Sequence, residues 1–190
     1  MLTAPFLTGK FAAGLPYEAY LATATPDQQL RWATARAQVT LSDEQRRLIR
    51  GFQRRVNVLV VSGAWCGDCA SQCPMLAVIA GVNPAAIHLR FLDRDAHLDL
   101  ADQVRICGGL RVPTVIFMNE DCEFVSIMGD KSLARLRAAA AKRLGPACEL
   151  PGAPVGESEA AQTLQDWLNE VERVHLLVRM SPKLRERHGN

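Results

Sequence analysis

Residues 56–69 read VNVLVVSGAWCGDC, and this stretch decides the fold of the chain. Its first part, residues 56–62, is a nearly continuous apolar run rich in β-branched side chains, which is typical of a central strand buried on both faces. A helix is expected to begin at about Gly67, which places Cys66 at the N-terminus of that helix. Cys69 follows about one helical turn later. The sequence therefore predicts two cysteines close together at the carboxyl end of a central strand.

Beyond this stretch the chain alternates between helical and strand patterns. We expect helices over residues 67–80, 98–105 and 131–144, and strands over residues 87–93, 114–118 and 123–128. The central strand, its helix and the next strand form a βαβ unit, so these two strands are expected to be parallel. The last two strands predict an antiparallel hairpin. The leucines and alanines of the helix over 131–144 are expected to cover one face of the sheet.

Helical patterns also occupy both ends of the chain. Thr25 and Ser42 each stand three residues before a glutamine, which is the capping-box signature of a helix N-terminus. An amphipathic helix after Ser158 is expected to fold back on the domain or, alternatively, to bind a partner, and the tail over 181–190 is expected to be frayed. We divide the chain into an N-terminal helical extension (1–55), an α/β domain (56–145), and a linker with a C-terminal amphipathic helix (146–190).

The composition is that of a soluble globular protein. Of the 190 residues, 48% are apolar and 22% are charged, and 22 basic against 20 acidic side chains leave a net charge of +2. This charge is too small to indicate binding to nucleic acid or to an anionic membrane surface. The N-terminal residues lack the pattern of a secretory signal, and no segment approaches the roughly 20 apolar residues of a membrane helix. We therefore expect a cytoplasmic protein.

Six cysteines in a reducing compartment favour redox or metal chemistry over structural disulfides. Unpaired N–H groups and the helix dipole would stabilise a thiolate at Cys66, so its pKa is expected below the free-thiol value of about 8.5. Cys69 is expected to be more buried and near enough to form a disulfide with Cys66. In such a pair Cys66 attacks a substrate disulfide, and Cys69 then attacks the mixed disulfide and releases the reduced product.

Two separated motifs resemble those of the thioredoxin family. They are Trp65-Cys66-Gly67-Asp68-Cys69 after the apolar strand and Val112-Pro113-Thr114 ahead of the hairpin. Pro74 and Gly129 also match, and the resemblance covers residues 56–143. It implies a thioredoxin fold of the α/β class. In that fold a central mixed sheet of four or five strands is flanked by helices, with extra N- and C-terminal helices here.

The resemblance also implies roles for the residues around the cysteines. Pro113 would follow a cis peptide bond and lie opposite the cysteine pair, where the Val112 backbone is presented to an extended substrate segment. Trp65 would shield one side of the Cys66 sulfur. The remaining residues expected to bind substrate or to tune the cysteines are Gly67, Asp68 and Thr114.

The sequence departs from the thioredoxin pattern at two positions. Asp68 stands where thioredoxins have a proline between the cysteines. Val60 stands where thioredoxins have a buried aspartate, so the usual proton acceptor for the resolving thiol is missing. Asp68 either replaces that acceptor or raises the cysteine pKa by like-charge repulsion. The residues alone leave both hypotheses open.

The sequence predicts a thiol–disulfide oxidoreductase, chiefly a reductase, and nothing in it indicates an organic cofactor. The expected partners are a disulfide-containing substrate and an electron donor such as a thioredoxin reductase or a low-molecular-weight thiol. Two other hypotheses remain. One is a thioredoxin-like binding module without turnover, and the other is a metal site formed by Cys66, Cys69, Cys73 and Cys107. Cys73 is otherwise a packing residue or a second resolving thiol. Cys107, if it binds no metal, is a packing or surface thiol, as are Cys122 and Cys148.

Overall fold

The computed structural model describes residues 1–144 and 158–189, and the linker predicted ahead of the C-terminal amphipathic helix lies almost wholly outside the described residues. The helices and strands are α1 (Ala4–Ala13), α2 (Tyr17–Ala22), α3 (Pro26–Ala37), α4 (Asp43–Arg50), β1 (Val56–Ser62), α5 (Gly67–Val82), β2 (Ile87–Asp93), α6 (Leu98–Ala101), β3 (Thr114–Met118), β4 (Phe124–Gly129), α7 (Leu133–Leu144), α8 (Glu159–Met180) and α9 (Pro182–His188). The predicted strands at 56–62, 87–93 and 114–118 agree with β1, β2 and β3 residue for residue.

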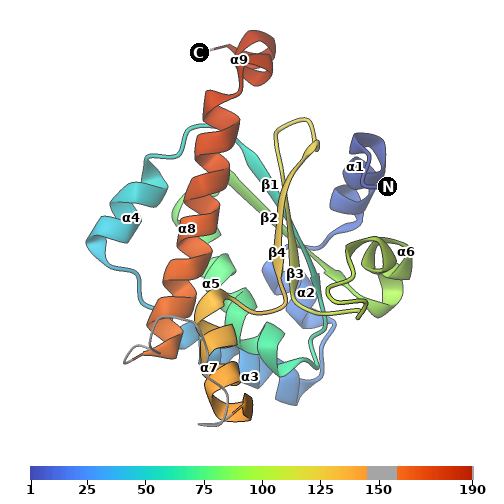
Figure 1. Ribbon diagram of the computed structural model, residues 1–190, viewed down its shortest axis with the longest axis vertical. Helices are drawn as coiled ribbons and strands as arrows, with labels where there is room; N and C mark the ends of the chain where they lie inside the picture. Colours follow the sequence, from blue (N-terminus) through green and yellow to red (C-terminus); the bar gives the residue numbers. More distant parts are fainter. Residues whose placement is uncertain (145–157, 190) are drawn as a thin grey trace.

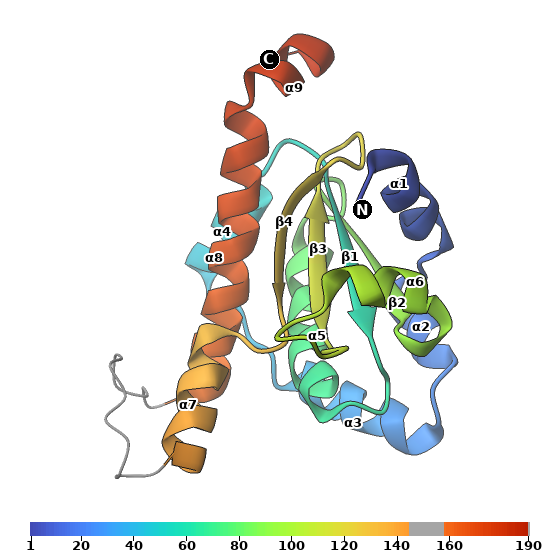
Figure 2. The same ribbon diagram turned by 45° about the vertical axis from the view of Figure 1, so that its right-hand side comes forward.

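A mixed sheet of four strands forms the centre of the molecule, with the strand order β2-β1-β3-β4. β1 and β2 are parallel, with Val56 opposite Ile87, whereas β3 is antiparallel to both β1 and β4. Helices α1 and α6 lie on one face of the sheet, and α5 and α8 lie on the other (Figure 1, Figure 2). All of β1 is buried because it lies inside the sheet and both its faces are covered. The predicted mixed sheet and antiparallel hairpin are confirmed.

At the outer edge of β2, a single residue occupies the place that a fifth strand would take. Leu15, between α1 and α2, exchanges two backbone hydrogen bonds of 2.8 Å with Phe91 in an antiparallel bridge. The chain is close to the sheet here, since a Cβ on Gly14 would lie 2.8 Å from Arg90 Cβ. The N-terminal helices therefore cover this edge, and the sheet has four strands, one of the two numbers that the resemblance allows.

Both predicted capping boxes are present. The hydroxyl of Thr25 accepts from the backbone N–H of Gln28 at the start of α3, and Ser42 does the same with Gln45 at the start of α4. Each glutamine side chain accepts in return from the N–H of its cap residue. These reciprocal bonds satisfy N–H groups that have no partner inside the helix, which is why the two starts are readable from sequence.

Aromatic side chains of the N-terminal helices pack on β2 and help to position the segment before Cys66. The ring of Phe91 lies 5.4–6.5 Å from those of Tyr17, Tyr20 and Trp32. Trp32 is fully buried, and its Nε1 donates to the carbonyl oxygen of Ala64 at 3.0 Å. Rings of this size contribute a large buried apolar area, and the indole N–H also finds its partner. The helices before β1 thus hold the turn that leads to the cysteines.

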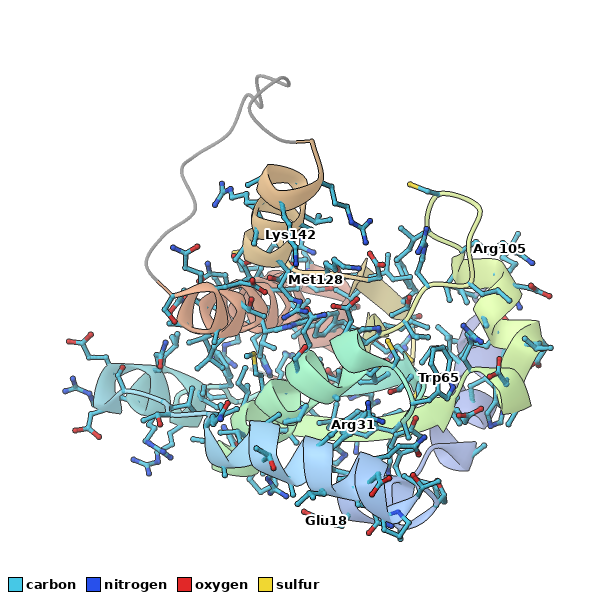
Figure 3. All side chains as sticks on the ribbon, turned by 90° about the horizontal axis from the view of Figure 1, so that it is seen from below. Glu18, Arg31, Trp65, Arg105, Met128 and Lys142 are labelled. Carbon is cyan, nitrogen blue, oxygen red and sulfur yellow. The ribbon has the colours of Figure 1, made fainter. Side chains whose placement is uncertain are left out.

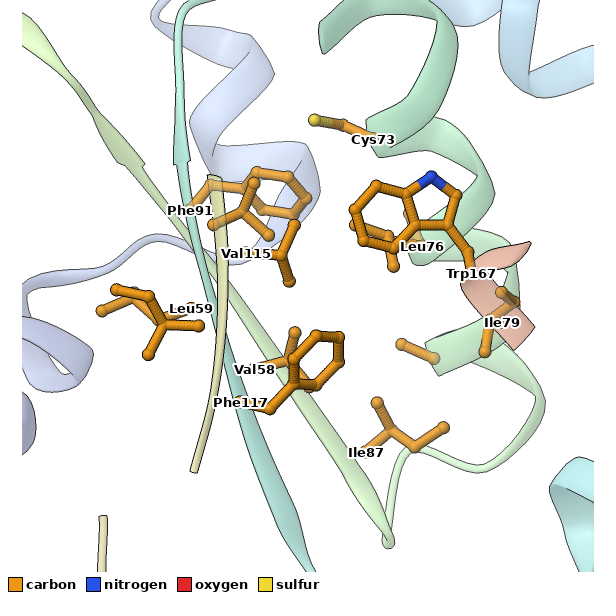
Figure 4. Packing of buried hydrophobic residues seen from close by; sticks show 14 of the residues in the cluster. Val58, Leu59, Cys73, Leu76, Ile79, Ile87, Phe91, Val115, Phe117 and Trp167 are labelled. Atoms are coloured by element: carbon orange, nitrogen blue, oxygen red, sulfur yellow. The ribbon is translucent and has the colours of Figure 1, made fainter. Parts of the chain in front are cut away.

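The helix that covers the sheet beside α5 is α8, and the prediction for α7 is wrong. Trp167 of α8 is fully buried and packs near Leu76 and Ile79 of α5 (Figure 4). In α7, by contrast, Leu133 is 51% and Leu136 is 49% exposed. The apolar stripe of α8 is longer and carries a tryptophan, so it buries more apolar area on that face than α7 can. The amphipathic C-terminal helix does fold back on the domain.

Two other segments differ from their predictions. The helix expected over 98–105 is only the short α6 with 3₁₀ turns at Asp95–His97 and Asp102–Val104. The tail expected to be frayed forms α9, which is anchored to the β3–β4 turn. There Lys183 pairs with Glu123 and Arg187 pairs with Asp121, each at 2.6 Å. These partners are about sixty residues away along the chain, so the local pattern of the tail does not show them.

A buried histidine makes the stability of the fold depend on pH. His175 of α8 is 5% exposed, and its ring stacks on Phe52 with 4.1 Å between the ring centroids. Burial lowers the pKa of His175 to about 4. In the unfolded chain its pKa is about 6.5, so between pH 6.5 and pH 4 the unfolded state binds a proton that the folded state does not. The free energy of unfolding therefore decreases as the pH falls through this range.

We expect the His175 contribution to cost about 2 kcal/mol of stability between pH 7 and pH 5. Urea unfolding of the wild-type protein and of His175→Phe at both pH values measures it. The phenylalanine keeps a ring against Phe52 but cannot bind a proton. The variant should therefore lose clearly less stability on acidification than the wild type. Equal losses in the two proteins would assign the acid sensitivity to other groups.

Candidate active site

The turn between β1 and α5 places Cys66 where the sequence predicts it. Cys66 is the N-cap residue of α5, with extended backbone angles (φ −78°, ψ 127°). Its N–H donates to the carbonyl oxygen of Gly63 at 2.9 Å, and its own carbonyl oxygen accepts from Ala70 at 2.9 Å. This geometry directs the first N–H groups of α5 toward the Cys66 side chain, where they favour negative charge.

The cysteine pair combines one accessible and one buried thiol. Cys66 is partly exposed, Cys69 is fully buried, and both are free thiols. The Sγ of Cys66 donates to the carbonyl oxygen of Val112 at 3.6 Å, which brings the two separated motifs together. The peptide bond between Val112 and Pro113 is cis. Thr114, also buried, donates from Oγ1 to the carbonyl oxygen of Arg111 at 2.8 Å and so fixes the loop opposite Cys66.

In the dithiol form the surroundings of both cysteines favour the protonated thiol. The hydrogen bond with Cys69, together with burial, raises the pKa of the Cys66 thiol, although backbone N–H groups of Cys69 and Asp68 act in the opposite direction. Burial raises the pKa of Cys69. The prediction that Cys66 titrates below its ordinary value is therefore wrong for the dithiol, because it counted the helix N-terminus and omitted the neighbouring thiol.

Asp68 is an ion-paired carboxylate, which neither sequence hypothesis anticipated. Its Oδ2 lies 2.9 Å from Lys131 Nζ, and its Oδ1 lies 2.7 Å from Arg135. Burial alone would raise the pKa of Asp68, but the bonds and charges of Lys131 and Arg135 outweigh it and lower the pKa. A carboxylate held in this way is a weak proton acceptor, and its negative charge is largely offset. The sequence offered one signal for this pairing. Lys131 and Arg135 are four residues apart in the helix predicted over 131–144, and residues at that spacing lie on the same side of a helix.

Trp65 forms an exposed wall next to the cysteine turn. Its side chain is 46% exposed, and the Arg94 guanidinium lies 4.7 Å above the ring centroid. Figure 3 shows Trp65 at this end of the molecule. A Cβ on Gly63 would lie 2.6 Å from the indole, so only glycine leaves room for the ring in this position. Arg94 was not identified from the sequence, because the residues between β2 and α6 carry several charges with no distinguishing pattern.

A buried hydroxyl at the end of β1 influences Cys69. Ser62, the last residue of β1, is fully buried, and its hydroxyl acts to lower the pKa of Cys69 against the effect of burial. Its Oγ also lies 3.8 Å from the Sγ of Cys73, which is fully buried in the core (Figure 4). Val60 is buried too and supplies no acid. Ser62 was not among the predicted site residues, although a polar residue that ends an apolar strand just before the cysteines was a usable signal.

The other cysteines lie apart from this pair or outside the described part of the chain. Cys107 is exposed, and Cys122 is buried with its Sγ 3.5 Å from the side-chain amide of Asn57. Cys148 lies outside the described residues. Within residues 1–144 and 158–189 there is no group of three or more His, Cys, Asp or Glu side chains arranged to hold a metal ion. None of the helices described is long and apolar enough to cross a membrane.

Comparison with known proteins places the chain in a family. A protein of unknown function from Pseudomonas aeruginosa has a similar crystal structure, with a TM-score of 0.67 and 18% identity over 86% of this chain and 93% of that one. An HIV epitope-scaffold is similar with a TM-score of 0.62 and 19% identity over 88% and 92% of the two chains. No curated protein matches this sequence. The family model described as thioredoxin matches residues 14–132, and the chain therefore belongs to the thioredoxin family.

Proposed function

We propose that the protein is a thiol–disulfide oxidoreductase that reduces disulfides through a cycle between Cys66 and Cys69. The observation that carries this proposal is the pairing of a partly exposed thiol at the N-terminus of α5 with a buried thiol one turn further on. The carbonyl oxygen of Val112 contacts the first of these thiols and leaves the Val112 backbone next to the position of an incoming disulfide. This arrangement supports a nucleophile and a resolving thiol.

The reaction transfers two electrons from the dithiol to the substrate. Cys66 loses its proton to solvent, and the resulting thiolate attacks one sulfur of the substrate disulfide. The substrate S–S bond breaks, and the other substrate sulfur leaves and takes up a proton. Cys69 then loses its proton and attacks Cys66 Sγ. The mixed disulfide breaks, the second substrate thiol leaves, and a Cys66–Cys69 disulfide remains. An external donor of two electrons and two protons, either the dithiol of a thioredoxin reductase or two molecules of a low-molecular-weight thiol, restores the reduced pair.

Neighbouring side chains support individual steps of this cycle. Trp65 and the Arg94 guanidinium above it form one wall for the substrate. The buried hydroxyl of Ser62 acts to lower the pKa of Cys69 against the effect of burial, which favours the proton loss that Cys69 must undergo. The reducing cytoplasm, which the sequence predicts as the compartment, would keep the pair in its dithiol form.

A redox titration tests the proposed function. Equilibrated with mixtures of oxidised and reduced dithiothreitol or glutathione, the protein should show one reversible two-electron couple, followed by mass spectrometry after alkylation of the free thiols. The couple should be absent from Cys66→Ser and from Cys69→Ser. It should be unchanged in Cys122→Ser, because Cys122 lies beside Asn57 in β1 and the β3–β4 turn. A wild-type protein without this couple would leave the binding module as the better hypothesis.

A further inference from the structure

We propose that Lys131 and Arg135 are positioning residues that set the reactivity of the Cys66 thiol by holding Asp68 between them. This inference rests on the function proposed above and concerns the tuning of the same site. The three residues, which we call the Asp68 clamp, come from two parts of the chain. Asp68 lies between the cysteines, whereas Lys131 lies in the segment between β4 and α7 and Arg135 lies in the first turn of α7.

The clamp is a short and partly buried ion-pair network. Lys131 Nζ lies 2.9 Å from Asp68 and 3.2 Å from Asp130, and Arg135 lies 2.7 Å from Asp68. The side chains of Asp68, Lys131 and Arg135 are 21–24% exposed. Charges that are mostly covered by protein are screened less by salt than those on the open surface. A change in any of the three charges should therefore change the pKa of Cys66, which lies within the same helical turn as Asp68.

The segment that carries Lys131 is fixed to α5 by a buried glutamine. Gln72, one turn after Asp68 in α5, is fully buried. Its amide nitrogen donates to the carbonyl oxygen of Asp130 at 3.0 Å, and its amide oxygen accepts from the N–H of Ser132 at 3.2 Å. The backbone on both sides of Lys131 is thus attached to the helix that begins at Cys66. This attachment holds the lysine in place against Asp68 instead of leaving it on a free loop.

The C-terminal helix α8 supports the other half of the clamp. Arg135 also pairs with Glu159 at 3.0 Å, and the N–H of Ala134 donates to Asp166 at 2.7 Å. The hydroxyl of Ser132 bonds with that of Thr163 at 3.3 Å. These contacts connect the first residues of α7 to α8. The C-terminal extension therefore takes part in holding the charges next to the redox pair, in addition to its packing on the sheet.

The sign of the effect follows from the charges. Asp68 lies two residues from Cys66, and its unpaired carboxylate would oppose formation of the thiolate. Lys131 and Arg135 offset that charge, so removal of either cation should raise the pKa of Cys66 and lower its reactivity. Removal of the Asp68 charge should do the opposite, since both cations remain. A purely structural role would change stability and leave the pH profile of Cys66 where it is.

The experiment compares the pH profiles of Cys66 alkylation in the wild type, Lys131→Met, Arg135→Met and Asp68→Asn. Iodoacetamide is the probe, and mass spectrometry of the Cys66 peptide separates its signal from that of the exposed Cys107. We expect the methionine variants to react roughly threefold more slowly at pH 7, which corresponds to half a pKa unit, and Asp68→Asn to react faster. The reduction potential should become more negative in the methionine variants and less negative in Asp68→Asn.

Matched variants separate charge from structure. Lys131→Arg and Arg135→Lys keep the positive charge and should keep the wild-type profile, and Arg143→Met removes an exposed cation from the same helix and should do so too. Circular dichroism verifies that each variant is folded. Unchanged profiles in both methionine variants, or shifts of the same sign in these and in Asp68→Asn, would overturn the proposal. Alkylation needs no turnover. It therefore measures the effect of the Asp68 clamp on the pKa of Cys66 even in a protein whose redox titration shows no couple.

Discussion

Cys66→Ser should reduce no disulfide, and Cys69→Ser should accumulate covalent complexes with its substrates. The first variant lacks the accessible thiol at the start of α5, so the attack on the substrate cannot occur. The second keeps that thiol but lacks the buried thiol that breaks the mixed disulfide. We expect a loss of activity below detection in both. Non-reducing gels and mass spectrometry of material captured on Cys69→Ser measure the trapped complexes.

The trapping experiment has two controls in the same chain. The double variant Cys66→Ser/Cys69→Ser should trap nothing, because the attacking sulfur is gone. Cys107→Ser should keep full activity. Cys107 is exposed in the turn between Ile106 and Gly109, and the described part of the structure records no contact between Cys107 and the Cys66–Cys69 pair. Complexes that persist in the double variant, or that depend on Cys107, would assign the nucleophile to a different cysteine. The identity of the captured proteins would also define the substrate class.

Gly129→Ala should unfold far more easily than the wild type. A Cβ at this position would lie 2.4 Å from the carbonyl oxygen of Pro113 and 3.0 Å from the Cα of Thr114. Both contacts are with backbone atoms, so no side chain can rotate away to relieve them. We expect a loss of about 3 kcal/mol in the free energy of unfolding, with a melting temperature lower by roughly 10 °C. Urea and thermal unfolding measure these changes.

The same substitution should also disturb the site, because the loop over 111–114 contacts Cys66 through the Val112 carbonyl oxygen. Gly81→Ala is the matched control. A Cβ on Gly81, near the end of α5, would have nothing within 4 Å. Because alanine favours the helix over glycine, we expect this variant to gain about 0.5–1 kcal/mol. A Gly129→Ala protein as stable as the Gly81→Ala protein would show that β4 can move away from Pro113 at little cost.

The strands and the cysteine turn could be predicted because their causes are local. The run from Val56 to Ser62 is apolar on both faces, and the helix start at Cys66 follows from the residues on either side of it. The choice of α8 over α7 as the covering helix could not be predicted in this way. Both have apolar faces, and the outcome depends on which one buries more area against α5.

The same distinction between local and distant causes applies to the chemistry of the site. That Cys66 attacks and Cys69 resolves remains a prediction. The burial of the two cysteines and their places at the start of α5 follow from the residues next to them in the sequence. The environment of Asp68 is not, since its two cations lie more than sixty residues further on. Local spacing suggested repulsion between Asp68 and the thiolate, and the tertiary contacts of Lys131 and Arg135 offset the Asp68 charge.

The bridge between Leu15 and Phe91 also bears on association between molecules. An uncovered strand at the border of a sheet offers its backbone N–H and C=O groups to other chains and can start aggregation. Here two of those groups on Phe91 are already bonded to Leu15, and the adjacent helices cover the same border. The N-terminal extension therefore hinders edge-to-edge pairing of β2 with a strand of another molecule. A protein shortened to begin at β1 would have to remain soluble without this cover on the edge of β2.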